Sequence, residues 1–258
     1  MKTKTVFAAS LLLAGAAFAD ATTVDSSYVL GVMPVNASGK SQVILSIPWV
    51  AEGGGSDIAV TNLVKTAGLT AGDTLTWYNT EDGKYNQWIA TSGSGGVLYW
   101  APVTSVINNS MYAVPADDAA LSQGQAVVLT RTATGEDLNK PIYVIGQVGA
   151  SGSVTTAIEP AASESAPKYT LIAPPVASGA GFDLNSATFT GDIDEKDEIT
   201  TDVVNGLSVK YVRNANGWRY VYEPDGKTAT VPAGCGFWYK RCGAGLLSIT
   251  WSAPSTSN

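Results

Sequence analysis

Histidine is absent from this sequence. Its absence excludes Ser-His-Asp and Cys-His nucleophile systems and every metal site that depends on imidazole ligands. An enzyme of this composition would have to use carboxylates, tyrosines or lysines. The acidic residues stand mostly in polar stretches, without the apolar surroundings that raise the pKa of a general acid. We therefore predict no catalytic residues and a non-enzymatic protein.

Basic residues are also scarce, with 15 Lys and Arg against 22 Asp and Glu and a formal net charge of -7. Binding to a phosphate backbone relies on Lys and Arg, so this balance disfavours nucleic acid and anionic lipid as partners. After residue 18, no apolar run approaches the roughly 20 residues of a membrane helix. We expect no integral membrane segment in the mature chain.

The first residues have the pattern of a secretory signal peptide. Met1-Lys2-Thr3-Lys4 is basic, Val6 to Phe18 is apolar but short, and Ala17-Phe18-Ala19 is a small-x-small cleavage site. The pattern predicts a signal peptide over residues 1–19 and cleavage before Asp20. A buried N-terminal helix is the alternative, and it fits the lysines less well. The mature protein is then secreted or held at the cell surface, with a formal charge of -9 once Lys2 and Lys4 are removed.

Glycine and the β-forming residues dominate what is present: the chain has 27 glycines, 7 tryptophans and 11 tyrosines, and many valines and threonines. This balance favours strands and tight turns over helices. Asp82-Gly83 and Asn216-Gly217 stand between apolar runs, as hairpin turns do. The sequence therefore predicts an all-β fold of short antiparallel strands.

A repeat with an offset of 126 organises these strands. The offset relates Pro34 to Pro160, Pro48 to Pro174, and Asp57 to Asp183. It predicts two tandem homologous units, each sandwich- or barrel-like, over residues 20–150 and 151–253, followed by a polar tail at 254–258.

Further along the chain the order of features persists. Asp197-Glu198-Ile199 stands where Asp73-Thr74-Leu75 stood, and Arg241 aligns with Arg131. The aromatic hairpin around Asn216-Gly217 is interpreted as the counterpart of the hairpin around Asp82-Gly83.

The chain resembles a loose family of uncharacterised secreted β-rich proteins of verrucomicrobial and related bacteria. The resemblance depends on Ser46-Ile47-Pro48, on Gly217-Trp218-Arg219-Tyr220, and on the strand from Val231 to Arg241 with its Pro-x-Gly-x-Gly-Phe-Trp motif. It implies a secreted β-rich fold and no activity. The first unit reads Gly124-Gln125-Ala126-Val127-Val128 at the corresponding place, so any role of Phe237 and Trp238 would be limited to the second unit.

Cys235 and Cys242 are the two cysteines, and an exported protein can keep a disulfide. If the residues between them form one extended strand, the thiols lie about 23 Å apart at roughly 3.3 Å per residue. A disulfide needs Cα atoms within about 7 Å. Free or intermolecular thiols are favoured over an internal bridge, which would require the strand to fold back.

The acidic segment from Asp192 to Glu198 offers several oxygen ligands. Asp192, Asp194 and Asp197 are the candidate calcium ligands, although Lys196 occupies the third ligand position of a calcium loop and no glycine follows. The alternative is a solvated acidic loop without a cofactor.

The aromatic residues give the remaining functional hint, because flat rings with polar tips can stack on sugars. Alternation places Trp218, Tyr220 and Tyr222 on one face of a strand, and with Trp238 they form the candidate ligand-binding set. The wider aromatic set comprises Trp77, Tyr78, Tyr85, Trp88, Tyr99, Trp100, Tyr211 and Tyr239. The alternative is that these rings fill the core.

Two functions follow as expectations. The first is a secreted, non-enzymatic structural or adhesive protein of the bacterial envelope or extracellular matrix that self-associates, for example by edge pairing of the segment from Tyr28 to Val35. The alternative is a carbohydrate-binding module that holds an extracellular glycan on an aromatic strand face. A hydrolase would require an acidic cleft between the units.

Overall fold

A computed structural model describes residues 30–35, 38–47, 57–59, 69–79, 83–104, 111–113, 120–147, 153–174, 182–204, 207–214, 217–221, 229–232 and 234–252. The expected signal peptide at residues 1–19, the boundary between residues 150 and 151, and the tail at 254–258 lie outside these residues. No helix in the described ranges is long and apolar enough to cross a membrane.

The fold is all-β, as the sequence predicts. The first half of the chain forms β1 (Leu30–Val35), β2 (Gln42–Ser46), β3 (Asp57–Ala59), β4 (Thr74–Asn79), β5 (Lys84–Ser92), β6 (Leu98–Pro102), β7 (Tyr112–Ala113), β8 (Ala120–Ser122), β9 (Ala126–Thr130) and β10 (Ile142–Gln147). The second half forms β11 (Ser153–Ile158), β12 (Lys168–Ile172), β13 (Phe182–Asp183), β14 (Thr188–Gly191), β15 (Glu198–Val204), β16 (Leu207–Asn214), β17 (Gly217–Tyr220), β18 (Thr230–Val231), β19 (Phe237–Arg241) and β20 (Leu247–Ser252). Short 3₁₀ turns lie at η2 (Ser94–Gly96), η3 (Gly135–Asn139) and η4 (Leu184–Ser186).

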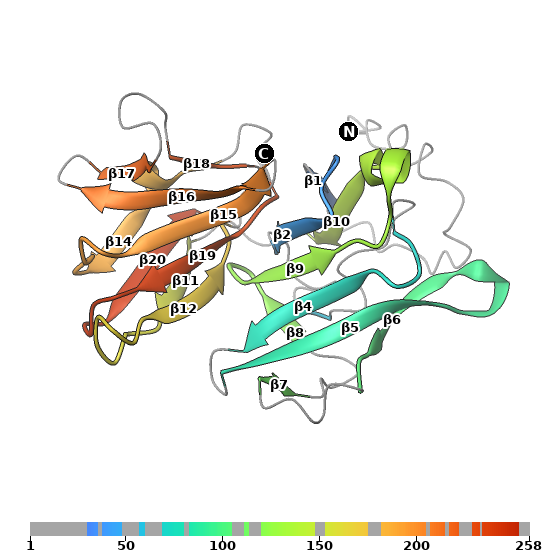
Figure 1. The fold of residues 1–258 in the computed structure, drawn as a ribbon, viewed down its shortest axis with the longest axis horizontal. Helices are drawn as coiled ribbons and strands as arrows, with labels where there is room; N and C mark the ends of the chain where they lie inside the picture. The colour runs from blue at the N-terminus through green and yellow to red at the C-terminus, as the bar shows by residue number, and fades with distance from the viewer. Residues whose placement is uncertain are drawn as a thin grey trace, which may run out of the picture.

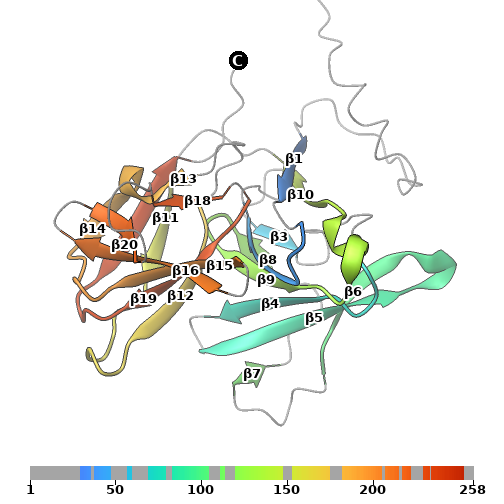
Figure 2. The same ribbon diagram turned by 45° about the horizontal axis from the view of Figure 1, so that its top comes forward.

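Each half contains one large sheet. In the first half its order is β2-β9-β4-β5-β6, with β7 added parallel to β5, and in the second half it is β12-β19-β15-β16-β17. Smaller sheets are β1-β10, β3-β8, β13-β18 and β11-β20-β14. The two large sheets lie side by side in Figure 1, and the smaller sheets lie behind and above them in Figures 1 and 2. None of the sheets formed by the described residues closes on itself, so the barrel-like alternative is not what the strands form.

The order of pairing is the same in the two halves. In each large sheet the first strand, β2 or β12, pairs with a strand from near the end of that half, β9 or β19, which we call the late strand. The late strand pairs with the hairpin β4-β5 or β15-β16, and β6 or β17 completes the sheet. The sheets β1-β10 and β11-β20 correspond in the same way, as do β3-β8 and β13-β18. Strands β7 and β14 have no counterpart among the described residues of the other half, and common descent of the halves stays a prediction.

The pairing registers do not keep the constant offset of 126. Val35 of β1 pairs with Ile142, and Ile158 of β11 pairs with Leu247. All four side chains are buried, so Ile158 is the counterpart of Val35 and the offset between β1 and β11 is 123 residues. Val43 of β2 pairs with Leu129, and Thr170 of β12 pairs with Tyr239, so the offset between β2 and β12 is 127 residues. The second half therefore has a longer turn before β12, and the matching spacing of Pro34 and Pro48 to Pro160 and Pro174 does not mark equivalent positions.

The aromatic hairpin of the second half is also reassigned. β15 and β16 are the counterpart of β4 and β5, because Ile199 pairs with Tyr211 as Leu75 pairs with Trp88. The turn at Gly217 joins β16 to β17 and corresponds to the turn between β5 and β6. The prediction that the Asn216-Gly217 hairpin is the counterpart of the Asp82-Gly83 hairpin is therefore wrong by one strand: β15-β16, not β16-β17, corresponds to β4-β5.

The core fills the space between the large and small sheets of each half. Alternation turns one side chain in two inward, so Val43 and Leu45 are buried from β2, and Phe237 and Tyr239 from β19. In the second half, the ring centroids of Phe237 and Trp251 lie 6.1 Å apart across the two sheets. Most buried apolar residues of both halves belong to one continuous cluster, and a second, smaller cluster lies at the junction between the halves.

Backbone hydrogen bonds join the halves. Ser46 donates its amide to the Gly234 carbonyl at 2.8 Å, and Ala173 donates to the Gly124 carbonyl at 3.0 Å. Bridges between Leu45 and Cys235 and between Gln125 and Ile172 repeat this exchange. The end of β2 thus bonds to the residues before β19, and the end of β12 bonds to the residues before β9. The two halves share backbone hydrogen bonds as well as a core.

Candidate functional site

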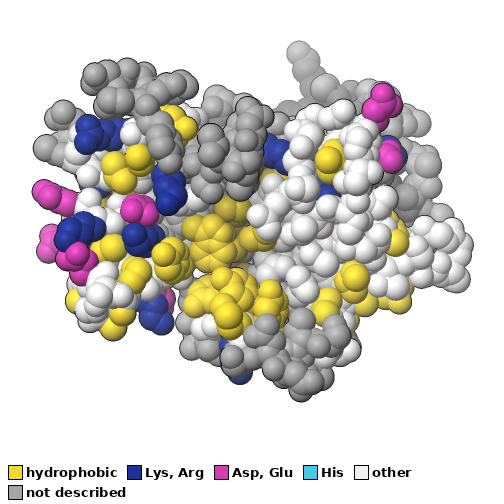
Figure 3. Space-filling view, viewed as in Figure 1, with side chains coloured by type: hydrophobic (Ala, Val, Ile, Leu, Met, Phe, Trp, Pro, Cys, Tyr) yellow, Lys and Arg dark blue, Asp and Glu magenta, His cyan; other side chains and the backbone are white. Residues whose placement is uncertain are grey.

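A groove of about 390 Å³ lies where the outer faces of the two large sheets meet. Both halves contribute side chains to it. Its lining residues are Gln42, Ile44, Thr76, Tyr85, Gln87, Tyr112, Val128, Thr130, Thr200, Thr201 and Trp238. Figure 3 shows hydrophobic side chains gathered at this junction between the halves.

Strand alternation explains why these residues face outward. Val43 and Leu45 of β2 point into the core, so their neighbours Gln42 and Ile44 lie on the opposite face. The pairing register then aligns four outward residues in one row across the sheet, which runs Ile44, Val128, Thr76 and Gln87. The first large sheet therefore presents a mixed apolar and hydrogen-bonding floor.

Four aromatic rings cluster at one end of this floor, and they come from both halves. Tyr85 lies 5.0 Å from Tyr78 and 5.6 Å from Tyr112, measured between ring centroids. The Trp238 ring meets Tyr78 edge-on at 6.0 Å and Tyr85 at 6.5 Å. Burial and the neighbouring rings of Tyr78 and Tyr112 raise the pKa of Tyr85, so its hydroxyl stays protonated at neutral pH. We call Tyr78, Tyr85, Tyr112 and Trp238 the aromatic cluster.

Amide and hydroxyl groups supply the polar part of the groove. Gln87 donates from Nε2 to Thr76 Oγ1 at 3.1 Å, and Gln42 Nε2 lies 3.5 Å from Thr130 Oγ1. These bonds orient each amide while its carbonyl oxygen accepts no hydrogen bond from the described residues. The groove can therefore offer both acceptors and hydroxyl donors to a ligand.

The lining contains no Asp, Glu, Lys, Arg or Cys. A general acid or base would need such a group within about 3 Å of the reacting atom. The groove can stack rings and form neutral hydrogen bonds, and its lining offers no carboxylate pair for glycoside hydrolysis.

The structure separates the predicted ligand-binding residues. Trp238 lies in the groove, but Trp218 is only 3% exposed and packs on Tyr239 and Phe189 at 5.8 and 6.0 Å between ring centroids. Tyr220 is partly buried against the same core, and Tyr222 lies outside the described residues. Trp218 is therefore a core residue, because the small sheet with β14 and β20 covers its face.

The glutamines and threonines of the groove carried no separate signal in the sequence. Tyr85 and Gln87 do alternate with the buried Trp88, which could have placed them together on an exposed face. The opposing wall could not have been found in this way, since it depends on how the two large sheets meet.

The acidic segment is held by hydrogen bonds and by ion pairs of Lys196 with Glu164, Asp197 with Arg241 and Glu198 with Lys240. Asp197 is fully buried and accepts from Arg241 Nη1 at 2.6 Å, from the Tyr239 hydroxyl at 2.8 Å and from the Cys242 amide at 2.7 Å. Asp194 accepts from the Lys196 amide at 2.9 Å, and Asp192 is exposed. Within the described ranges, no three His, Cys, Asp or Glu residues are arranged to hold a metal ion. Asp197 thus anchors the loop to β19.

Cys235 and Cys242 form no disulfide, and both are buried. The Cys242 thiol lies 3.3 Å from the Lys196 carbonyl, and burial raises its pKa. The structure thus has no bridge between the two cysteines, and their state in the exported protein stays a prediction. Burial also keeps both sulfur atoms from reaching a second molecule in the folded state.

Comparison with known proteins adds no relative: no family model, curated protein or solved structure matches the chain. The resemblance to secreted β-rich bacterial proteins accordingly stays a prediction.

Proposed function

We propose that this is a secreted, non-enzymatic protein that binds an extracellular glycan in the groove between its two large sheets. The observation that carries the proposal is the aromatic cluster beside a row of Thr and Gln side chains in one groove. Of the two functions expected from the sequence, the geometry favours carbohydrate binding, through Trp238 and residues of the first half.

The chemistry of a sugar ring fits both parts of the groove. One face of a pyranose is rich in C–H groups and packs on an aromatic ring, while its hydroxyls need donors and acceptors. The Trp238 ring offers the first, and Gln42, Gln87 and Thr76 offer the second. The uncharged lining favours binding over hydrolysis.

An adhesive role is compatible with this binding, because a glycan-binding protein at a cell surface attaches the cell to that glycan. Self-association through the segment from Tyr28 to Val35 has less support. β1 already pairs with β10 along its whole length, which occupies one of its two edges.

The test is affinity electrophoresis of the mature chain through gels that contain single polysaccharides from plant cell walls, mucins and bacterial capsules. We expect at least one polysaccharide to retard the protein. Trp238→Ala should weaken that binding about tenfold or more, because it removes the ring on which the sugar stacks.

Tyr99→Ala is the matched control. Tyr99 is an exposed aromatic residue on β6 that does not line the groove, so its removal should leave retardation unchanged. Circular dichroism should confirm that both variants keep the native spectrum. Loss of retardation in both variants, or in neither, would contradict the groove as the binding site.

A further inference from the structure

The outer face of the second large sheet continues the groove along strands β19, β15 and β16. Thr200 pairs with Trp238 on one side and with Lys210 on the other. The row of outward residues that begins at Leu171 and Trp238 therefore ends at Lys210. A ligand stacked on Trp238 would meet Thr200 next along this row and the Lys210 ammonium group on the strand beyond it.

The neighbouring row of the same face is also cationic. It runs Tyr169, Lys240, Glu198, Val212 and Arg219. Lys240 lies 3.3 Å from Glu198, so this pair neutralises itself. Lys210 and Arg219 are exposed and form no ion pair with the described residues. Among the described residues, two cations without an ion-pair partner thus stand on the same outer face as Trp238, on β16 and β17.

This placement runs against the overall charge of the chain. The protein has a net charge of -7, yet the described side chains of these two rows contribute Lys210, Lys240 and Arg219 against Glu198 alone. Figure 3 shows Lys and Arg side chains spread over the second half of this face, with Asp and Glu side chains among them and at its edge, while the first half presents mostly uncharged side chains. A local cationic field on an acidic protein selects for anionic groups on the ligand.

We propose that the glycan is anionic, with sugar rings stacked on Trp238 and carboxylate or sulfate groups paired with Lys210 and Arg219. This inference rests on the proposed function and names the ligand class. The uncharged groove recognises the sugar backbone, and the cationic strip recognises its substituents.

The experiment compares each anionic polysaccharide with a neutral form of the same backbone. Polygalacturonate is paired with its fully methyl-esterified form, and dextran sulfate with dextran. We expect the anionic member of at least one pair to bind about tenfold tighter at low salt, and the preferred pair distinguishes carboxylate from sulfate. Binding should weaken as salt rises, because the strip is exposed and screened.

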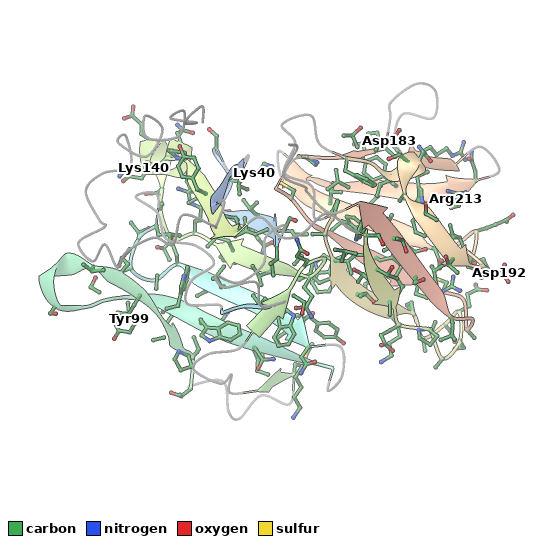
Figure 4. The ribbon with its side chains drawn as sticks, turned by 180° about the vertical axis from the view of Figure 1, so that it is seen from behind. Lys40, Tyr99, Lys140, Asp183, Asp192 and Arg213 are labelled. Carbon is green, nitrogen blue, oxygen red and sulfur yellow. The ribbon has the colours of Figure 1, made fainter. Side chains whose placement is uncertain are left out.

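The double variant Lys210→Gln with Arg219→Gln should reduce binding to the anionic member about tenfold and flatten its salt dependence, while leaving any binding to the neutral member unchanged. The matched control is Lys40→Gln with Lys140→Gln, which removes the same charge. Both control residues lie in the first half near β1 and η3, and neither lines the groove (Figure 4). The control should bind as the wild type does.

Three outcomes would overturn the inference. Equal binding of both members of each pair would refute the anionic ligand while the proposed function stands. Equal losses in the two double variants would reduce the effect to net charge. Polyglutamate binding as tightly as the preferred polysaccharide would mean that the strip attracts any polyanion. Absence of binding to every polysaccharide would instead contradict the proposed function itself.

Discussion

At the scale of single residues, the most consequential groups are two buried aspartates at equivalent places. Asp197 Oδ1 accepts from the Cys242 amide at 2.7 Å, and Asp73 Oδ1 accepts from the Thr132 amide at 2.7 Å. Each aspartate also accepts from the amide three residues before it, on Asp194 or Thr70. In both halves, therefore, an aspartate just before the first hairpin strand, β4 or β15, binds the backbone just after the late strand, β9 or β19.

The two aspartates differ in their remaining partners. Asp197 also binds the Arg241 guanidinium and the Tyr239 hydroxyl, and burial raises the pKa of Tyr239 so that it stays a donor. Asp73 instead accepts from the Thr70 and Thr132 hydroxyls. Only the second half combines this fastening with a buried ion pair among the described residues.

We predict that Asp197→Asn destabilises the protein by about 3–5 kcal/mol, because it leaves the buried Arg241 without its charge partner. Asp73→Asn should cost about 1–3 kcal/mol, the range for losing a buried hydrogen-bond acceptor. Urea unfolding at pH 7 gives both values. An Asp197→Asn variant no less stable than Asp73→Asn would contradict the importance of the ion pair.

The predicted repeat pairs Asp197 with Asp73, and the two accept matching hydrogen bonds, but the sequence could not decide which aromatic residues are exposed. Trp218 and Trp238 both lie in alternating strands with aromatic and basic neighbours. Trp218 is buried because the sheet with β14 and β20 covers its face, whereas Trp238 is only partly buried where the first large sheet meets its face at Tyr78 and Tyr85. Alternation separates the two faces of a strand, but only tertiary packing determines which face is covered.

At the scale of elements, the sequence predicted the strands better than their equivalence. Apolar alternation and the Asp82-Gly83 signal are local, and they correctly gave antiparallel hairpins. Equivalence depended on a constant offset, which fails because the turn before β12 is longer and because the turn at Gly217 belongs to the next pair of strands. Turn lengths vary between related units, so spacing along the chain is a poor measure of position in a sheet.

The junction between β2 and β19 depends on one close approach at Gly236. A Cβ atom there would lie 2.8 Å from Ala126 Cβ, 2.8 Å from Ile44 Cγ2 and 2.9 Å from the Ile172 carbonyl oxygen. These atoms belong to both halves, and the Gly236 amide also donates to the Ile44 carbonyl at 2.9 Å. The missing side chain thus permits the halves to exchange hydrogen bonds.

We predict that Gly236→Ala lowers the free energy of unfolding by about 1–3 kcal/mol, because the added methyl group overpacks this junction. Thermal and urea denaturation would measure the loss. Gly245→Ala is the matched control, since a Cβ there would meet only an Arg241 nitrogen at 3.8 Å. Equal stability of the two variants would mean that the junction can relax without cost.

At the scale of the whole molecule, the groove exists only because the two large sheets meet. Its walls come from β2, β4, β5, β7 and β9 on one side and from β15 and β19 on the other. No local pattern in the sequence encodes this meeting, which depends on contacts between residues far apart in the chain, such as Leu45 with Cys235 and Gln125 with Ile172. A hydrolase would require a deep acidic cleft between the halves, and the groove at that place has an uncharged lining.

The shared core and the exchanged hydrogen bonds predict that the halves unfold together. Leu45 and Ile172 each bridge to the opposite half, and one apolar cluster contains buried residues from both. Separating the halves would expose the apolar surface of this junction, which also includes the second cluster of Ile44, Ala126, Val128, Leu171 and Ala173. Burial of apolar surface is worth roughly 25 cal/mol per Å², so neither half should keep its full stability alone.

We therefore predict one cooperative transition for residues 20–258. Far-ultraviolet circular dichroism and tryptophan fluorescence should give coincident curves in urea, and calorimetry should give equal calorimetric and van't Hoff enthalpies. Fragments 20–150 and 151–258 should each unfold at lower urea than the intact chain. Gly236→Ala should shift the whole transition, because the junction belongs to both halves. Two resolved transitions, or a fragment as stable as the intact chain, would mean that the units fold independently, and the groove would then be an interface between two domains that can separate.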